Sequence, residues 1–371
     1  MNTVSSASIT GMVVSLILCV AAPVALCVLL KRKTGAKLSN MLLGAVTFVI
    51  FAMFLEQMLH LAMSAVFGEK LTGNLWLSAL YGGAAAAVFE EFGRLVAMKY
   101  FLGSQLEKEN ALMYGVGHGG VEALFVGGLT CVSNLATVSM VNGGKLESAL
   151  AGLDEAARAT SLETISQLWT LPAYLFYMVG MERLIALALQ ICLSYLVYRA
   201  VRYHRRGFFL AAMGIHFAVD ALGALLKDAV PVPVLEAILA AIVIVLVLTL
   251  TSRSYAEVPV LIMTFGAAAL LNMGTNFLCG TISFISNSVT VILQLALAID
   301  YAIILCHRFS DEHETKDTRE ACIAALSKAI PEISSSSLTT ISGLGALAFM
   351  HFGIGRDMAT VLIKAILFSL L

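Results

Sequence analysis

Apolar segments of membrane-spanning length follow one another along almost the whole chain. A helix needs roughly 17 to 25 predominantly apolar residues to cross a bilayer. Eleven stretches of the sequence approach this length, namely 8–30, 39–66, 75–102, 111–133, 171–200, 207–227, 233–251, 257–278, 284–306, 336–353 and 357–371. Of the 371 residues, 59% are hydrophobic and 13% are charged. The sequence therefore predicts an all-α fold, a polytopic transmembrane helical bundle of about eleven spans.

The basic residues predict how the bundle is oriented, because Lys and Arg are enriched on the cytoplasmic side of a membrane. They cluster between alternate pairs of predicted spans, at Lys31, Arg32, Lys33, Lys37, Arg199, Arg202, Arg205, Arg206, Arg253 and Arg308. The relatively acidic loop 143–165 falls on the other side. We therefore expect the N-terminus to lie outside.

Ionisable side chains occur in pairs inside three of the apolar stretches before residue 221. They are Glu90 with Arg94 and the adjacent Glu91, His118 with Glu122, and His216 with Asp220. A spacing of four places both members of a pair on one helix face. A charge at the bilayer centre costs roughly 2.5 to 3.5 kcal/mol on insertion scales, so such residues are expected to face a bundle interior or a wet cavity. The pattern predicts an intramembrane active site.

The residue types suggest roles within this site. Adjacent carboxylates on a helix point about 100° apart, so one of Glu90 and Glu91 can pair with Arg94 while the other activates water. An imidazole beside a carboxylate can hold water, donate to an oxyanion or bind a metal. Asp220 is a candidate for orienting His216, as carboxylates do for imidazoles elsewhere.

A structural alternative exists for each of these pairs, because buried ion pairs can simply fasten a helix bundle. Glu56 and His60 form another pair at the same spacing, for which we favour packing or support of the site. Glu182 and Arg183 receive no role from the sequence.

The ordered set of motifs on three spans resembles a known family. E-E-x-x-R at 90–94, Y-x-x-x-H at 114–118 and H-x-x-x-D at 216–220 resemble the YhfC branch of the CPBP clan of intramembrane proteases, relatives of the CAAX prenyl-protein endopeptidases. The resemblance covers roughly residues 1–230. The wider clan usually has one more residue before the Arg and an Asn in place of the final Asp.

The resemblance implies that Glu90 or Glu91 activates the attacking water and that His118 and His216 polarise the scissile carbonyl. Arg94, Glu122 and Asp220 join them as candidate catalytic residues. The clan has been described both as glutamic proteases, which need no cofactor, and as metalloproteases. A metal such as zinc would be held among Glu91, His118 and His216, although the sequence has no H-E-x-x-H motif.

The chain changes character near 230–256, where Val230-Pro231-Val232-Pro233 forms a natural break. We therefore predict two modules, 1–230 and 231–371. The second resembles the transmembrane part of the MMPL branch of the RND transporters. The segments that carry this likeness are 251–255, 271–276, 298–303, 325–331 and 334–344, and the family associates an Asp-Tyr pair, here Asp300 and Tyr301, with proton relay. An intramembrane carboxylate is itself a functional hypothesis.

The RND-like part is expected to be partial, because the family's first span, its large extracytoplasmic domain and its second half are missing and the last span stops short. The sequence also lacks a phosphate-cradling glycine loop, so ATP drive is not indicated. The primary hypothesis is thus an intramembrane endopeptidase fused to a partial RND bundle. The alternatives are a transporter fragment or subunit acting with partners that supply the missing RND parts, and a catalytically idle scaffold.

The expected surroundings follow from these hypotheses. We expect a bacterial cytoplasmic membrane, contact with membrane lipid, and a peptide or membrane-protein substrate. No nucleic acid is expected as a partner.

Overall fold

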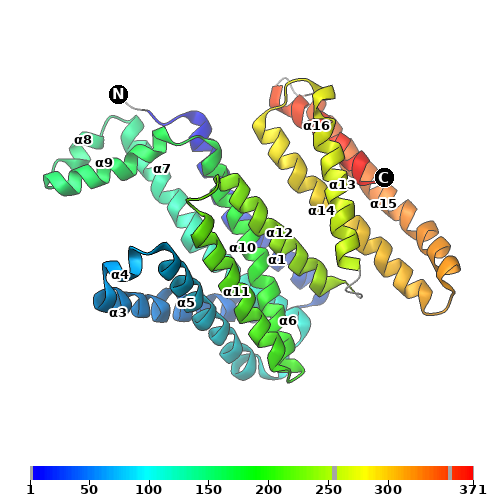
Figure 1. The fold of residues 1–371 in the computed structure, drawn as a ribbon. Helices are drawn as coiled ribbons and strands as arrows, with labels where there is room; N and C mark the ends of the chain where they lie inside the picture. Colours follow the sequence, from blue (N-terminus) through cyan, green and yellow to red (C-terminus); the bar gives the residue numbers. More distant parts are fainter. Residues whose placement is uncertain (1–2, 253–256, 350–352, 371) are drawn as a thin grey trace. The chain divides into compact units, whose positions relative to one another are not determined.

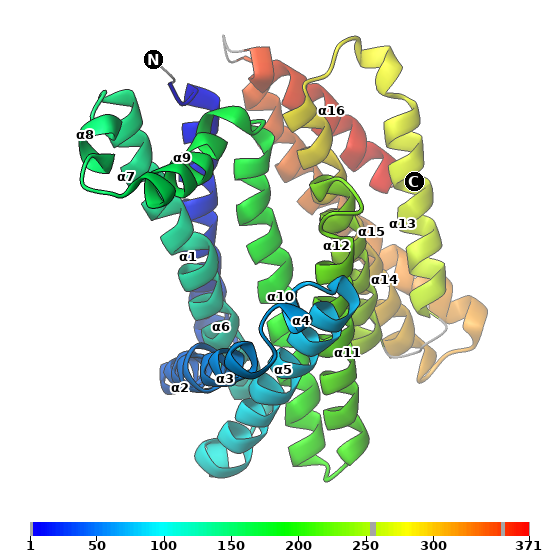
Figure 2. The ribbon, with the colours of Figure 1, turned by 60° about the vertical axis from the view of Figure 1, so that its left-hand side comes forward.

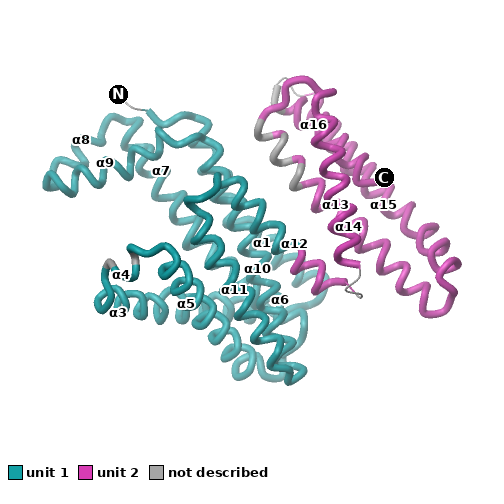
Figure 3. Tube along the Cα trace, viewed as in Figure 1, with its two compact units in different colours: residues 1–244 teal, residues 245–371 magenta. Residues whose placement is uncertain are grey.

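The computed structural model describes residues 3–252, 257–349 and 353–370. The described residues form helices joined by short turns, and no strand occurs among them (Figure 1). The predicted all-α class is confirmed. By their contacts the residues divide into two compact units, 1–244 and 245–371 (Figure 3). The division lies within a helix, α12 (Val232–Thr251), and inside the stretch 230–256 where the sequence changes character.

Unit 1 contains the three motif-bearing segments. Its elements are α1 (Ser6–Thr34), α2 (Leu38–Phe48), η1 (Val49–Glu56), α3 (Gln57–Phe67), α4 (Glu69–Thr72), α5 (Leu75–Val96), η2 (Ala97–Leu102), η3 (Gly103–Gln105), α6 (Lys108–Glu122), η4 (Ala123–Gly128), α7 (Leu129–Asn142), α8 (Leu146–Leu150), α9 (Glu155–Thr170), α10 (Tyr174–Arg202), α11 (Arg206–Leu226) and the first part of α12. Unit 2 contains the rest of α12, then α13 (Glu257–Gly274), η5 (Asn276–Cys279), α14 (Phe284–His313), α15 (Thr318–Ala348) and α16 (Gly353–Ser369).

Polar side chains set several helix starts. Ser5 precedes α1, and its side chain accepts a hydrogen bond from the backbone N–H of Ser8. Asn74 does the same for α5 through the N–H of Leu77. Such caps satisfy backbone donors that a first helical turn leaves without partners. Gly35 ends α1 with φ at 75°, a left-handed conformation that glycine adopts without strain.

Three long helical segments of unit 1 each contain a stretch of π-helix. These are η1 after α2, η2 after α5 and η4 after α6. A π-turn changes the direction in which the following side chains point and is frequent at functional sites. Glu56 is the last residue of η1, and Glu122 immediately precedes η4.

Helices α2 and α6 touch backbone to backbone. A Cβ added to Gly117 would lie 1.9 Å from the carbonyl oxygen of Met41, and one added to Gly44 would lie 2.1 Å from that of Tyr114. Small residues permit this approach between membrane helices. Helix α6 also packs on α1 and α10, and α5 packs along α11 (Figure 2). The helix that carries His118 is therefore the buried centre of unit 1.

Eight helical segments in the described part of the chain are long and apolar enough to cross a membrane. They are Ser6–Thr34, Leu38–Phe67, Lys108–Asn142, Tyr174–Arg202, Arg206–Leu226, Val232–Thr251, Glu257–Cys279 and Leu293–His313. Three of the stretches predicted from the sequence are not among them. The stretch 75–102 contains the charges of α5, 336–353 begins inside the partly polar α15 and runs into residues outside the described part, and α16 has 17 residues. The chain is a multi-pass helical membrane protein.

Candidate active site

Four helices of unit 1 bring the predicted site residues together. Helix α5 contributes Glu90, Glu91 and Arg94, α6 contributes His118, and α11 contributes His216. All five side chains are buried, with residue exposures between 0% and 7%. The fourth helix, α10, contributes Gln190, which is not among the residues predicted from the sequence. The three motifs therefore meet at one buried polar cluster.

The carboxylate of Glu90 is the meeting point of this cluster. Its Oε2 lies 2.9 Å from Nε2 of His118 and 3.9 Å from Nε2 of His216. The same oxygen accepts hydrogen bonds from Nη2 of Arg94 at 3.4 Å and from Nε2 of Gln190 at 3.2 Å. No hydrogen bond to Oε1 of Glu90 occurs among the described residues. One oxygen of Glu90 is thus held and the other is left open.

Glu91 faces a different way and has different partners. Its Oε1 accepts a hydrogen bond from Nη1 of Arg94 at 2.9 Å and one from Nδ1 of His216 at 2.8 Å. Glu91 is fully buried and lines neither of the cavities described below. An ionised carboxylate only accepts hydrogen bonds, so the Nδ1 atom of His216 must carry the proton it donates. Glu91 therefore orients the imidazole of His216.

Asp220 also contacts His216, but on the other ring nitrogen. Its Oδ2 lies 3.4 Å from Nε2 of His216, and 37% of the Asp220 side chain is exposed. From the sequence, Asp220 is the candidate for orienting His216. In the structure the shorter and fully buried contact to that ring comes from Glu91.

Glu122 does not pair with His118, although the spacing of four suggested a pair. Its Oε1 accepts a hydrogen bond from Nη1 of Arg183 at 3.0 Å, and its Oε2 accepts one from Nε2 of Gln190 at 2.6 Å. The guanidinium of Arg183 on α10 supplies a charge-assisted partner that a neutral imidazole cannot match. Arg183, which received no role from the sequence, also hydrogen-bonds Glu182.

Gln190 links the Glu90–Arg94 ion pair to Glu122, which is paired with Arg183. Its Oε1 accepts from Arg94, while its Nε2 donates to both Glu90 and Glu122. Helix α10 comes this close because Gly119 has no side chain, since a Cβ there would lie 2.9 Å from the Cβ of Gln190. A buried amide within an apolar span was the available sequence signal, because polar groups inside a membrane need partners.

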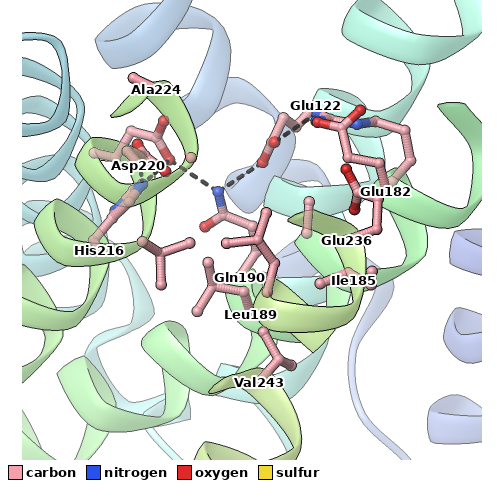
Figure 4. A pocket seen from close by; sticks show the side chains of 16 residues that line it. Glu122, Glu182, Ile185, Leu189, Gln190, His216, Asp220, Ala224, Glu236 and Val243 are labelled. Atoms are coloured by element: carbon pink, nitrogen blue, oxygen red, sulfur yellow. Dashed lines mark hydrogen bonds and ion pairs between the residues drawn. The ribbon is translucent and has the colours of Figure 1, made fainter. Parts of the chain in front are cut away.

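Two cavities meet at this cluster, and Glu90 and Glu122 line both. The first encloses about 300 Å³, and its lining residues come from α5, α6, α10, α11 and α12. Figure 4 shows His216 and Asp220 on one side of it, Glu122, Glu182 and Glu236 on the other, and Gln190 between them. The second encloses about 360 Å³ and lies between residues of α2, η1 and α3 and residues of η4. Glu90, whose Oε1 has no hydrogen bond among the described residues, therefore lies where the two cavities meet.

The arrangement of these side chains does not fit a bound metal ion. Among the described residues, no three His, Cys, Asp or Glu side chains are grouped so that they could hold one. The oxygen of Glu90 that the imidazoles face already accepts from Arg94 and Gln190, and the guanidinium supplies the positive charge there. The predicted ligand Glu91 is likewise engaged by Arg94 and His216.

The pair Asp300 and Tyr301 lies in unit 2, on α14. Tyr301 is buried, and its hydroxyl lies 2.7 Å from Oγ of Ser337 on α15, which donates to it. The neighbouring Asp300 is exposed, and adjacent residues of a helix point about 100° apart. The two side chains therefore do not face the same surroundings.

Comparisons with known proteins match the two parts of the chain to two different families. Residues 17–245 match the family model described as YhfC intramembrane metalloprotease, and residues 231–371 match that of the MMPL family. The protein called "Uncharacterized membrane protein YhfC" from Bacillus subtilis (strain 168) is 34% identical over 228 residues, which cover 59% of this chain and 87% of that relative. No solved structure matches the chain. With the family model spanning more than half of its length, the chain belongs to the YhfC intramembrane metalloprotease family.

Proposed function

We propose that unit 1 is an endopeptidase that hydrolyses a peptide bond at or within the membrane. The single observation that carries the proposal is the set of contacts made by the Glu90 carboxylate. One of its oxygens is fixed by two imidazoles, a guanidinium and an amide, and the residue lines both cavities with the other oxygen open. A carboxylate fixed in this way can accept a proton from a water molecule in either cavity.

In the proposed reaction, Glu90 takes a proton from water through Oε1, and the water oxygen forms a bond to the carbonyl carbon of the substrate. The proton passes from Glu90 to the leaving nitrogen as the carbon–nitrogen bond breaks. Positioned acid–base groups contribute roughly 10² to 10⁴ in rate. The products are a carboxylic acid and an amine, and Glu90 returns to its starting state.

The donors available to the oxyanion are the Nε2–H of His118 and the Nε2–H of a doubly protonated His216, whose Nδ1 donates to Glu91. Both Nε2 atoms point toward the carboxylate that activates the water, so a carbonyl oxygen placed beside Glu90 lies within their reach. Removing one such donor typically costs roughly 10² to 10³ in kcat. Glu91, Arg94 and Gln190 act as positioning residues, because they hold His216 and Glu90 without facing the open oxygen.

The family description names a metalloprotease, but no step of this reaction passes through a metal, because the donors at Glu90 are arranged around a guanidinium. The proposed setting is the cytoplasmic membrane of a bacterium, where lipid surrounds unit 1. The proposed substrates are membrane proteins or membrane-bound peptides.

The test compares peptide termini in membranes from cells that express the wild type, Glu90→Gln or His118→Ala at matched levels. Glu107→Gln, an exposed carboxylate at the start of α6, serves as the control variant. New N-termini are expected with the wild type and the control and are lost in both site variants. Identical termini in all four membranes, with every variant inserted and folded, would overturn the proposal.

A second candidate function belongs to residues 231–371, which match the MMPL family. In this alternative, unit 2 takes part in proton-coupled transport together with a partner that supplies the remaining transporter parts. Efflux that depends on the proton gradient and disappears in Asp300→Asn would support this alternative. Efflux unchanged in that variant would remove it.

A further inference from the structure

The cavity of about 360 Å³ beside Glu90 combines an apolar wall with carboxylates. Its lining residues are Phe48, Ala52, Met53, Glu56, Gln57, Glu90, Glu122, Phe125 and Val126. The apolar side chains could pack against a hydrocarbon stem, and the carboxylates could accept hydrogen bonds from a polar tip. Glu56 is the member that the reaction proposed above does not use.

A chain of hydrogen bonds holds Glu56 in place. Nε2 of His60 lies 3.2 Å from Oε1 of Glu56, and Nδ1 of His60 lies 2.8 Å from the hydroxyl of Tyr81. Since an ionised carboxylate only accepts, Nε2 must be the donor to Glu56. A neutral His60 then accepts at Nδ1 from the Tyr81 hydroxyl. This relay orients Glu56, and a neutral His60 brings no positive charge to it.

The other oxygen of Glu56 is available to a ligand. Glu56 is 7% exposed, and it lines the cavity. No hydrogen bond to its Oε2 occurs in the part of the chain that the structure describes. A buried carboxylate without a full set of partners is costly in a membrane, and a ligand that donates hydrogen bonds would relieve that cost.

The balance of charge in the cavity favours a cation as that ligand. Glu90 is paired with Arg94 at 3.4 Å and Glu122 with Arg183 at 3.0 Å. For Glu56, the ion-pair contact among the described residues is the one to His60. Arg94 also pairs with Glu91, and Arg183 also pairs with Glu182. The carboxylates around the cavity therefore outnumber the two guanidinium groups, and neither guanidinium contacts Glu56.

We propose that this cavity binds the side chain of a Lys or Arg residue of the substrate, next to the bond that is cut, with the cationic head at Glu56. The inference rests on the proposed peptidase function. Lys and Arg bury their hydrocarbon stems along apolar surfaces while the charged head finds a polar partner, and the wall formed by Phe48, Met53 and Phe125 suits such a stem. Glu56 is then a residue that determines specificity, while Glu90 performs the chemistry.

The test uses quenched fluorescent peptides built on the most abundant cleavage site found in membranes. Within the set, the residues flanking the cut bond are changed in turn to Lys, Met or Glu, and cleavage is measured with the full chain in liposomes. Met is nearly as long as Lys and carries no charge, so it isolates the effect of the cationic head. Wild type is expected to prefer Lys over Met by about tenfold or more at one flanking position, which corresponds to one charge-assisted contact.

The decisive comparison is between the peptide preferences of Glu56 variants and those of the wild type. Glu56→Gln should cleave the Lys and Met peptides at equal rates. Glu56→Asp should retain part of the Lys preference, and Glu56→Lys should shift the preference toward Glu. Glu107→Gln, at an exposed position that does not line the cavity, should behave as the wild type does.

The outcomes separate this inference from the function on which it rests. Cleavage by the wild type with no preference for Lys, or a preference that Glu56→Gln leaves unchanged, overturns the inference and keeps the peptidase. A preference abolished equally by Glu107→Gln also overturns it. No cleavage of any peptide by inserted, folded wild type, together with no new termini in membranes, overturns the peptidase itself.

Discussion

Nδ1 of His216 lies 2.8 Å from Oε1 of Glu91, the same oxygen that accepts a hydrogen bond from Arg94 at 2.9 Å. One carboxylate thus joins α5 and α11 through an imidazole and a guanidinium at once. The neighbouring Glu90 faces the opposite nitrogen of the ring, at 3.9 Å. Adjacent glutamates therefore have different partners because the helix points them in different directions.

Glu91→Gln should lower turnover without abolishing it. The amide can still accept from one donor, but it no longer carries the charge that balances Arg94 and fixes the His216 ring. Loss of a group that orients an imidazole typically costs roughly 10- to 100-fold in activity. We expect kcat to fall by that factor with KM little changed, whereas Glu90→Gln should leave no measurable cleavage. Equal activity of Glu91→Gln and wild type would contradict the assigned role.

Arg94 should matter for stability as much as for activity. It is fully buried and contacts Glu90, Glu91 and Gln190. Removing one partner of a buried ion pair typically costs roughly 3 to 5 kcal/mol, because the other charge stays buried. Arg94→Met is therefore expected to unfold at a clearly lower temperature in detergent. Arg94→Lys should recover part of the loss, since it keeps the charge but not the planar fork.

Gln190→Leu tests the link between the two buried ion pairs. Leucine fills a similar volume but removes the acceptor for Arg94 and the donors to Glu90 and Glu122. We expect about 10- to 100-fold lower turnover, in the range seen when supporting partners of a site are lost. Ser194→Ala on the same helix is the control, because buried Ser194 bonds the backbone oxygen of Gln190 and no carboxylate. A matching loss in the control would attribute the effect to general packing of α10.

Gly117→Ala and Gly44→Ala should disrupt unit 1. The added methyl groups would lie 1.9 Å and 2.1 Å from backbone oxygens, and a backbone cannot move aside as a flexible side chain can. We expect loss of folded protein after detergent extraction, measured by gel filtration. Gly82→Ala is the matched control, since nothing lies within 4 Å of its added Cβ. It should be neutral or stabilising by about 0.5 to 1 kcal/mol.

Removal of divalent metal is expected to leave peptidase activity intact. The guanidinium of Arg94 and the amide of Gln190 already donate to the oxygen of Glu90 that both imidazoles face. Purified full-length chain treated with a strong chelator and then freed of it by dialysis should cleave at the untreated rate. Loss of cleavage that added zinc restores would show instead that Glu90, His118 and His216 hold a metal.

Span length predicted the membrane bundle, and the cost of burying charge in a membrane predicted that Glu90, Arg94, His118 and His216 would meet at one polar site. It could not predict which side chain of another helix each residue would meet. Glu122 pairs with Arg183 on α10 instead of His118, one turn away on its own helix. That choice depends on how α6 and α10 pack and on the π-helical stretch after Glu122, neither of which leaves a periodic signal.

Gln190 is a second residue whose contacts could not be predicted from the sequence. Its position in the sequence is that of a single polar residue within an apolar helix, which fits a packing role as well as a functional one. Its importance comes from three partners on two other helices, at Glu90, Arg94 and Glu122. Asp300 and Tyr301 likewise looked like one unit in sequence, but adjacent residues of a helix point about 100° apart, and only Tyr301 is buried.

The backbone contact between α2 and α6 also bears on how much sequence change this family can absorb. A Cβ on Gly44 would lie 2.8 Å from the backbone nitrogen of His118, so the backbone at His118 packs directly against α2. Side chains facing lipid can then vary freely while the register of the two helices stays fixed. Saturation mutagenesis should show sharp intolerance at these glycines and broad tolerance at outward positions such as Leu42 and Val46, which are 67% and 52% exposed.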